Sequence, residues 1–76
     1  MSENEIIARN VKEIRKEFGQ SQIEFAADCG ISVEELSLIE RNKADPKLST
    51  LQKIAAYIDE PVAYLITEHA DMLYTV

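Results

Sequence analysis

The two side chains best suited to chemistry are the only cysteine, Cys29, and the only histidine, His69. A cysteine beside a histidine can act as a nucleophile, and groups of these residues hold zinc. One residue of each type is too few for a zinc site, and no orienting motif surrounds either of them. Cys29 stands among small and apolar neighbours, so we expect a buried hydrophobic side chain. With no glycine-rich phosphate loop either, the sequence predicts no enzyme, no metal site and no cofactor.

Between Gln22 and Asn42, small and apolar residues have the spacing of two packed helices. Ala26 falls where the helices would cross, and Gly30, four positions later, can adopt a positive φ in a turn. Leu36 and Ile39 would then pack the second helix back onto the first. This pattern predicts a helix-turn-helix, whose second helix lies in the major groove of DNA.

Capping signals divide the whole chain into five expected helices. The pattern S-x-x-E, in which a serine caps a helix and the glutamate bonds back to it, occurs at three places. It predicts helices over about 3–18, 21–30 and 32–42. Glu35 is expected to serve the third of these caps, Ser49 to cap a fourth helix, and Pro61 to lie in the first turn of a fifth. No segment before the tail alternates as a strand does, so we predict a compact all-α domain of five helices.

Apolar residues recur at helical spacing and define the expected core. Three helices would bury the sets Ile7, Val11, Ile14 and Phe18; Leu51, Ile54, Ala55 and Ile58; and Val62, Leu65 and Ile66. A chain of 76 residues supports one small core, because so short a chain buries only about 60% of its unfolded surface. We therefore expect a single domain over 1–76, with its core within about 5–66.

Three stretches carry a likeness that extends beyond the helix-turn-helix itself: VKEIRKEFGQSQIEFAADCGIS, LSLIERNKADPKLSTLQKIA and EPVAYL. In them the chain resembles the lambdoid phage-repressor (Cro/CI-type, XRE-like) helix-turn-helix family, over roughly residues 7–66. Members of that family are five-helix domains that bind operator DNA, usually as two-fold dimers. The resemblance implies a homodimeric transcriptional regulator that binds double-stranded DNA, with a recognition helix over about Ser32 to Asn42.

The same resemblance implies roles for individual residues. Its base contacts map onto Ser32, Val33, Glu34, Ser37 and Leu38. Its phosphate contacts map onto Ser21, Gln22, Arg15, Arg41, Asn42, Lys43 and Lys47. Arg15 would also form an ion pair with Glu40 and tie the first helix to the third. At Ser21 and Gln22 the free N–H groups and the dipole of a helix N-terminus favour an anion.

The expected recognition helix departs from the common family pattern at three positions. Arginine, glutamine, serine or lysine often stands where this chain has Val33, Glu34 and Leu38, so donors for guanine or adenine are missing. In one interpretation, Glu34 accepts a hydrogen bond from cytosine while Val33 and Leu38 contact thymine methyl groups. In the other, the helix belongs to a protein-interaction module, such as an antitoxin-like or anti-regulator component, with little DNA binding. We expect the first, a DNA-binding regulator, and keep the second as the alternative.

The charge of the chain is unusual for a DNA-binding protein. Its formal net charge is −6, from 14 acidic and 8 basic residues, whereas such proteins usually carry a positive excess. Seven of the 8 basic residues fall in segments that flank the expected recognition helix: Arg9, Lys12, Arg15, Lys16, Arg41, Lys43 and Lys47. Many acidic residues lie towards the two termini. This uneven distribution permits DNA binding despite the negative total.

The last residues, 67–76, carry more apolar side chains than a free tail should. Either they close the core, or they form a dimer contact that involves Tyr64, Ile66, Met72 and Leu73. We expect the dimer, with two recognition helices one DNA turn (~34 Å) apart. No apolar run approaches the ~20 residues of a membrane span, and the N-terminus lacks the features of a secretory signal. We therefore expect a cytoplasmic protein without membrane contact or small-molecule ligand.

Overall fold

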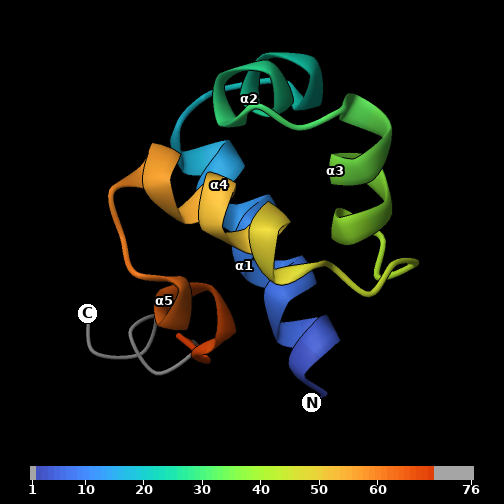
Figure 1. Cartoon of the computed structure of the whole chain (residues 1–76), viewed down its shortest axis with the longest axis vertical. Helices are drawn as coiled ribbons and strands as arrows, with labels where there is room; N and C mark the ends of the chain where they lie inside the picture. The colour runs from blue at the N-terminus through green and yellow to red at the C-terminus, as the bar shows by residue number, and fades with distance from the viewer. Residues whose placement is uncertain (1, 70–76) are drawn as a thin grey trace.

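Five α-helices are formed by residues 2–69, the part of the chain that the computed structural model describes (Figure 1). They are α1 (Glu3–Glu17), α2 (Gln22–Cys29), α3 (Val33–Glu40), α4 (Leu48–Ile58) and α5 (Val62–Ile66). No strand occurs within 2–69, so the predicted all-α fold with five helices is confirmed. α2 and α3 follow one another across a short turn, and α5 lies at the opposite end of the molecule from α2 (Figure 1). No helix in the described part is long and apolar enough to span a bilayer.

Two of the three predicted capping boxes are present. Ser2 Oγ accepts from the Glu5 backbone N–H at 3.2 Å, and the Glu5 carboxylate accepts from the Ser2 N–H at 3.3 Å. The same pair of bonds joins Ser21 and Glu24, at 3.1 and 2.9 Å. Each box satisfies N–H groups that the first turn of a helix leaves without a partner.

The third box is only half formed. Ser32 Oγ accepts from the Glu35 N–H at 3.0 Å, as predicted. The Glu35 carboxylate does not bond back to Ser32 but accepts a hydrogen bond from Thr50 Oγ1 on α4, at 2.5 Å. The prediction for the Glu35 side chain is therefore wrong, because a partner distant in the sequence replaces the local one.

The predicted starts of the last two helices are also wrong. Lys47, not Ser49, is the N-cap of α4, because the backbone leaves its extended geometry (φ −72°, ψ 153°) at that residue. Pro61 is the N-cap of α5 and not a residue of its first turn. Neither cap makes a side-chain hydrogen bond.

The helix predicted over Ser32 to Asn42 is shorter than expected. α3 ends at Glu40, since Asn42 takes a positive φ of 56° that turns the chain away. The N–H groups of Asn42 and Lys43 donate to the carbonyls of Ile39 and Leu38, at 3.0 and 2.8 Å. These bonds form a Schellman-type end, in which asparagine takes the place usually held by glycine.

The core is built from all five helices. Its largest fully buried side chains are Phe25, Leu36, Ile39, Ile54, Leu65 and Val11. Phe18, predicted to lie inward, is 46% exposed, because it is the C-cap of α1 and lies past the end of the buried stripe. Its ring packs at the edge of the core against Phe25 and Tyr57, with centroids 6.1 and 5.5 Å apart.

A buried amide joins the first helix to the last. Asn10, in the inward stripe of α1, is 7% exposed, and its Nδ2 donates to the carbonyls of Leu65 and Thr67 at 2.9 and 2.8 Å. Both bonds satisfy carbonyls at the C-terminal end of α5 that have no partner within the helix. A polar residue between the apolar positions 7 and 11 is the one local signal of this contact, and it does not indicate which partner Asn10 takes.

Candidate nucleic-acid interface

One edge of α3 lies open to solvent while its opposite face is buried. Ser32, Val33, Glu34 and Leu38 are exposed and Ser37 is half-buried, so the five predicted base-contact positions share one uncovered edge. Leu36 and Ile39, on the other face, are 0% and 2% exposed. α3 is therefore anchored in the core by Leu36 and Ile39 and presents Val33, Glu34 and Leu38 outward.

The turn before α3 depends on Gly30. This residue ends α2 with φ 80°, in the left-handed region that other residues adopt at a cost. A Cβ added there would meet no atom within 4 Å, so backbone conformation and not crowding requires glycine. Ala26, at the predicted crossing, is 1% exposed and packs in the core with Leu36 and Ile39.

The last turn of α3 is held by a buried carboxylate. Glu40, whose side chain is 3% exposed, accepts from Arg15 Nε and Nη2 at 2.7 and 3.1 Å, which is the ion pair that the family resemblance implies. Glu40 also accepts from Gln22 Nε2 at 3.1 Å, a contact that the sequence did not indicate. The bonds to Glu40 raise the pKa of Arg15 above its ordinary value. One carboxylate thus joins α3 to α1 and to the first turn of α2.

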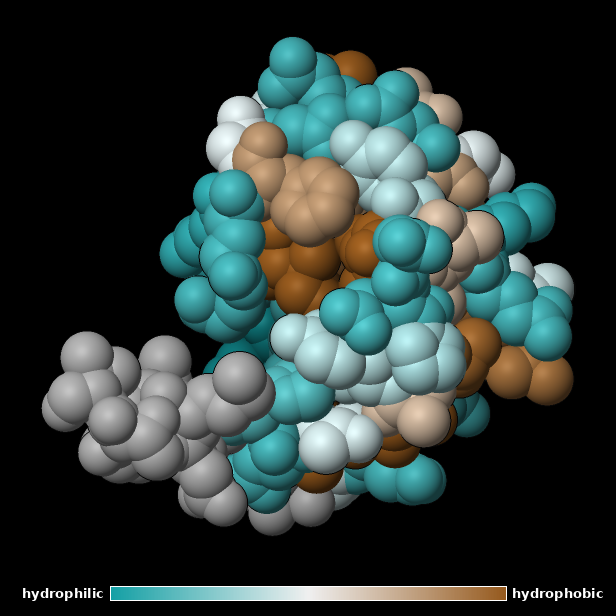
Figure 2. Space-filling view, turned by 90° about the vertical axis from the view of Figure 1, so that its left-hand side faces the viewer, coloured by the Kyte–Doolittle hydropathy of each residue, from teal (hydrophilic) through white to brown (hydrophobic). Residues whose placement is uncertain are grey.

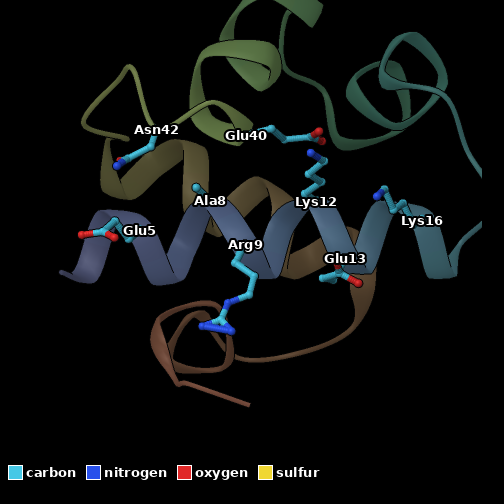
Figure 3. A pocket seen from close by; sticks show the side chains of 8 residues that line it. All are labelled: Glu5, Ala8, Arg9, Lys12, Glu13, Lys16, Glu40 and Asn42. Atoms are coloured by element: carbon cyan, nitrogen blue, oxygen red, sulfur yellow. The ribbon is translucent and has the colours of Figure 1, made fainter. Parts of the chain in front are cut away.

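An open groove runs along α1 beside the end of α3 (Figure 3). It is lined by Glu5, Ala8, Arg9, Lys12, Glu13, Lys16, Glu40 and Asn42. Lys12 and Lys16 point from α1 towards the side of α3, whereas Arg9 points the other way, towards α5 (Figure 3). There Arg9 Nη2 lies 3.9 Å from a carboxylate oxygen of Glu68. The basic side chains of α1 therefore point in two directions: Lys12 and Lys16 towards α3, and Arg9 towards α5.

The remaining predicted phosphate-contact residues border the open edge of α3. Arg41, Asn42, Lys43 and Lys47 are all exposed and lie in the connection between α3 and α4. Ser21 is exposed at the N-cap of α2, and Gln22 is half-buried in its first turn. Because Gln22 bonds to Glu40, the start of α2 lies beside the last turn of α3.

The predicted dimer-contact residues fall only partly within the described chain. Tyr64 and Ile66 are half-buried on α5. The Tyr64 ring stacks on His69, with centroids 4.1 Å apart, and the His69 ring is bonded through Nε2 to the Tyr64 carbonyl at 2.8 Å. Met72 and Leu73 lie outside the described residues 2–69.

Cys29 is buried, as expected, and no group of three or more metal-ligand side chains occurs among the described residues. Burial, assisted by the charge of Asp28, raises the pKa of the Cys29 thiol to about 11.

Since only the thiolate is a nucleophile, we expect the native protein at pH 8 to react with a thiol reagent about 100-fold more slowly than the unfolded chain. The native rate should rise with pH until about 11. A native rate equal to that of the unfolded chain would show that Cys29 is accessible and ionised.

Comparison with known proteins agrees with this geometry. A family model described as helix-turn-helix matches residues 11–65, more than half of the chain. The chain belongs to the helix-turn-helix family of the Cro/CI type. Two similar proteins are the HTH-type transcriptional regulators SinR of Bacillus licheniformis and Bacillus subtilis, each 36% identical over 70 residues, which are 91% of this chain and 63% of the relative.

Two further similarities extend the comparison within this helix-turn-helix family. The immunity repressor protein of Bacillus phage phi105 is 32% identical over 62 residues, covering 82% of this chain and 43% of that protein. The chain therefore spans less than two thirds of the length of these three relatives. The crystal structure of a hypothetical transcription factor, NHTF, from Neisseria matches with a TM-score of 0.86 and 27% identity, over 99% of this chain and 86% of that one.

Proposed function

We propose that the chain is a sequence-specific transcriptional regulator that binds operator DNA as a homodimer, with α3 in the major groove. The observation that carries this proposal is the uncovered edge of α3, from Ser32 to Leu38, on a helix whose other face is anchored by Leu36 and Ile39. The names of the similar proteins, two transcriptional regulators and a repressor, support the same function. The proposed function involves binding and no catalytic step.

Base recognition in this proposal uses an acceptor and apolar contacts. Glu34 accepts from the amino group of cytosine, and the exposed side chains of Val33 and Leu38, each 38% accessible, contact thymine methyl groups. Ser32 and Ser37 can donate or accept. Specificity then depends on few direct contacts, so DNA shape and phosphate positioning contribute a large share.

Phosphate binding in this proposal uses groups on both sides of α3. Ser21 and Gln22 offer the N-terminus of α2, while Arg41, Asn42, Lys43 and Lys47 hold the opposite strand. Gln22 donates one amide hydrogen to Glu40 and retains a second for a phosphate. Arg15 donates to Glu40 and to the Gln20 carbonyl, which leaves two of its five N–H groups for the backbone of the DNA.

The homodimer in this proposal uses α5 and the residues that follow it. Tyr64 and Ile66 are half-buried, and with Met72 and Leu73 they would form a two-fold contact. Figure 2 shows the side of the molecule away from α3, with a hollow of hydrophobic residues in its upper half, above the height at which Figure 1 places α5. A contact on this side would leave the edge of α3 uncovered in both subunits.

Selection of bound duplexes from a random pool tests the proposed function. We expect recovery of a two-fold motif whose half-sites are 10–10.5 base pairs apart, centre to centre. Failure to enrich any motif at low salt would contradict DNA recognition. In that case the exposed Val33 and Leu38 would favour a protein-interaction module on the same fold.

The affinity for the selected site should depend steeply on salt. Contact with four to six phosphates per dimer predicts a slope of about −4 to −5 for log affinity against log salt. Replacing Lys43 with alanine should reduce that slope by about 1 for each phosphate that the variant no longer binds. Lys53→Ala is the matched control, because Lys53 is exposed on α4, outside the predicted contact set, and its removal should leave the slope unchanged. Equal effects of the two variants would argue against a specific role for Lys43.

A further inference from the structure

The first turn of α3 divides its side chains between solvent and the body of the protein. Val33 and Glu34 are exposed, whereas the next residue, Glu35, is half-buried and accepts a hydrogen bond from Thr50 Oγ1. Thr50 is 5% exposed and lies in the first turn of α4. The bond therefore connects the turn that displays Val33 and Glu34 to a fixed point in the core.

The N-terminus of α4 lacks a capping side chain and a negative charge of its own. Its N-cap residue, Lys47, makes no side-chain capping bond, and its first turn contains no acidic residue. A negative charge near the positive end of a helix dipole is stabilising, and Glu35 supplies one from another helix. Glu35 thus places a carboxylate beside the first turn of α4, where it accepts from the Thr50 hydroxyl and does not bond back to Ser32.

Two carboxylates consequently hold α3, one near each end. Glu40 joins the last turn to α1 and α2, and Glu35 joins the first turn to α4. α3 has only eight residues, so each attachment lies close to its exposed edge. The attachment through Glu35 is the one nearer to Val33 and Glu34.

We propose that Glu35 and Thr50 are positioning residues for base recognition: their hydrogen bond fixes the angle at which the first turn of α3 presents Val33 and Glu34. This inference rests on the proposed DNA-binding function. Contacts to base edges depend on close geometry, whereas attraction to phosphates is long-ranged and tolerates small shifts. Loss of the bond therefore lowers the preference for the correct sequence and spares general affinity for DNA.

Three variants of the full chain test the inference. Thr50→Val removes the hydroxyl and keeps the shape of the side chain, while Thr50→Ser keeps the hydroxyl. Ser49→Ala is the matched control, because it removes an exposed hydroxyl from the same turn of α4, outside the predicted DNA and dimer contacts. For each variant, affinity is measured for the selected site and for an unrelated duplex, at a temperature where circular dichroism shows the chain fully folded.

We expect Thr50→Val to reduce the ratio of specific to non-specific affinity about tenfold, the size of one good base contact. Its affinity for the unrelated duplex and the salt slope on that duplex should stay unchanged, and Thr50→Ser and Ser49→Ala should keep the ratio of the unmodified protein. An unchanged ratio in Thr50→Val, or an equal loss of both affinities, would overturn the inference while the proposed function stands. If the unmodified protein selects no site at all, the proposed function itself fails, and the inference falls with it.

Discussion

Replacing Glu40 with alanine should lower the free energy of unfolding by about 3–5 kcal/mol, the cost of removing one partner of a buried ion pair. The Glu40 side chain is 3% exposed and that of Arg15 is 14% exposed. Once the carboxylate is removed, water can therefore hydrate the Arg15 charge only in part. Gln22 Nε2 would lose its partner at the same time. For a domain of this size the loss corresponds to a fall of at least about 12 °C in Tm.

Thermal and denaturant unfolding of Glu40→Ala measure this loss. The matched control is the double variant Arg15→Met with Glu40→Leu, which removes both charges and restores apolar volume. It should be more stable than Glu40→Ala alone, because no charge is left buried without a partner. A loss below about 1 kcal/mol in Glu40→Ala would mean that the pair behaves as a surface salt bridge and does not anchor α3.

The second large effect is expected at Leu36, where alanine should lower the free energy of unfolding by about 2–5 kcal/mol. Leu36 is 0% exposed and packs with Ala26 and Ile39 in the core, so truncation leaves a cavity under α3. Thermal unfolding measures the loss. Leu36→Met, which nearly conserves volume, should cost less than about 1.5 kcal/mol.

Leu38→Ala, compared with Leu36→Ala on the same helix, distinguishes an effect on DNA recognition from an effect on stability. Leu38 is 38% exposed, so its truncation should change stability by less than about 1 kcal/mol. Its effect should appear instead in base preference, because the shortened side chain no longer reaches a thymine methyl group. A Leu38→Ala variant with unchanged preference and weaker binding to a protein partner would favour the interaction module.

Local signals in the sequence predicted most of the fold. The capping boxes at Ser2 and Ser21 were predictable because each involves residues three positions apart, with no contribution from the rest of the chain. The positive φ of Gly30 follows from a residue type that adopts it without strain. The apolar periodicity also predicted the buried faces of α1 and α4, because a helix brings every third and fourth residue to one side.

Contacts between distant segments were not predictable from these signals. Glu35 has the spacing of a local cap but bonds to the Thr50 hydroxyl, because the fold brings that hydroxyl of α4 within its reach. Asn10 bonds to carbonyls at the end of α5, more than 50 residues away, and Gln22 joins the Arg15–Glu40 pair. Each of these partners depends on how the helices pack, which periodicity does not specify.

The direction of charged side chains was also beyond sequence patterns. The segments predicted to be basic do border α3, and Lys12 and Lys16 point towards it (Figure 3). Arg9, only three residues before Lys12, lies beside Glu68 near α5. Residues three apart on a helix are neighbours, so the spacing places Arg9 and Lys12 on adjoining positions and does not indicate that their long side chains reach towards different helices. A charge count by segment therefore overstated the positive charge beside α3.

NMR titration of the full chain with a duplex that carries the selected site tests whether the open edge of α3 contacts DNA. Backbone amide shifts report each residue separately, so the contacted surface can be mapped on the chain. We predict the largest changes at residues 32–38, with smaller ones at Ser21, Gln22 and the 41–47 connection, and little change in the first turns of α1. Saturable binding that leaves residues 32–38 unshifted, with its changes on another face, would contradict the assignment of α3 as the recognition helix.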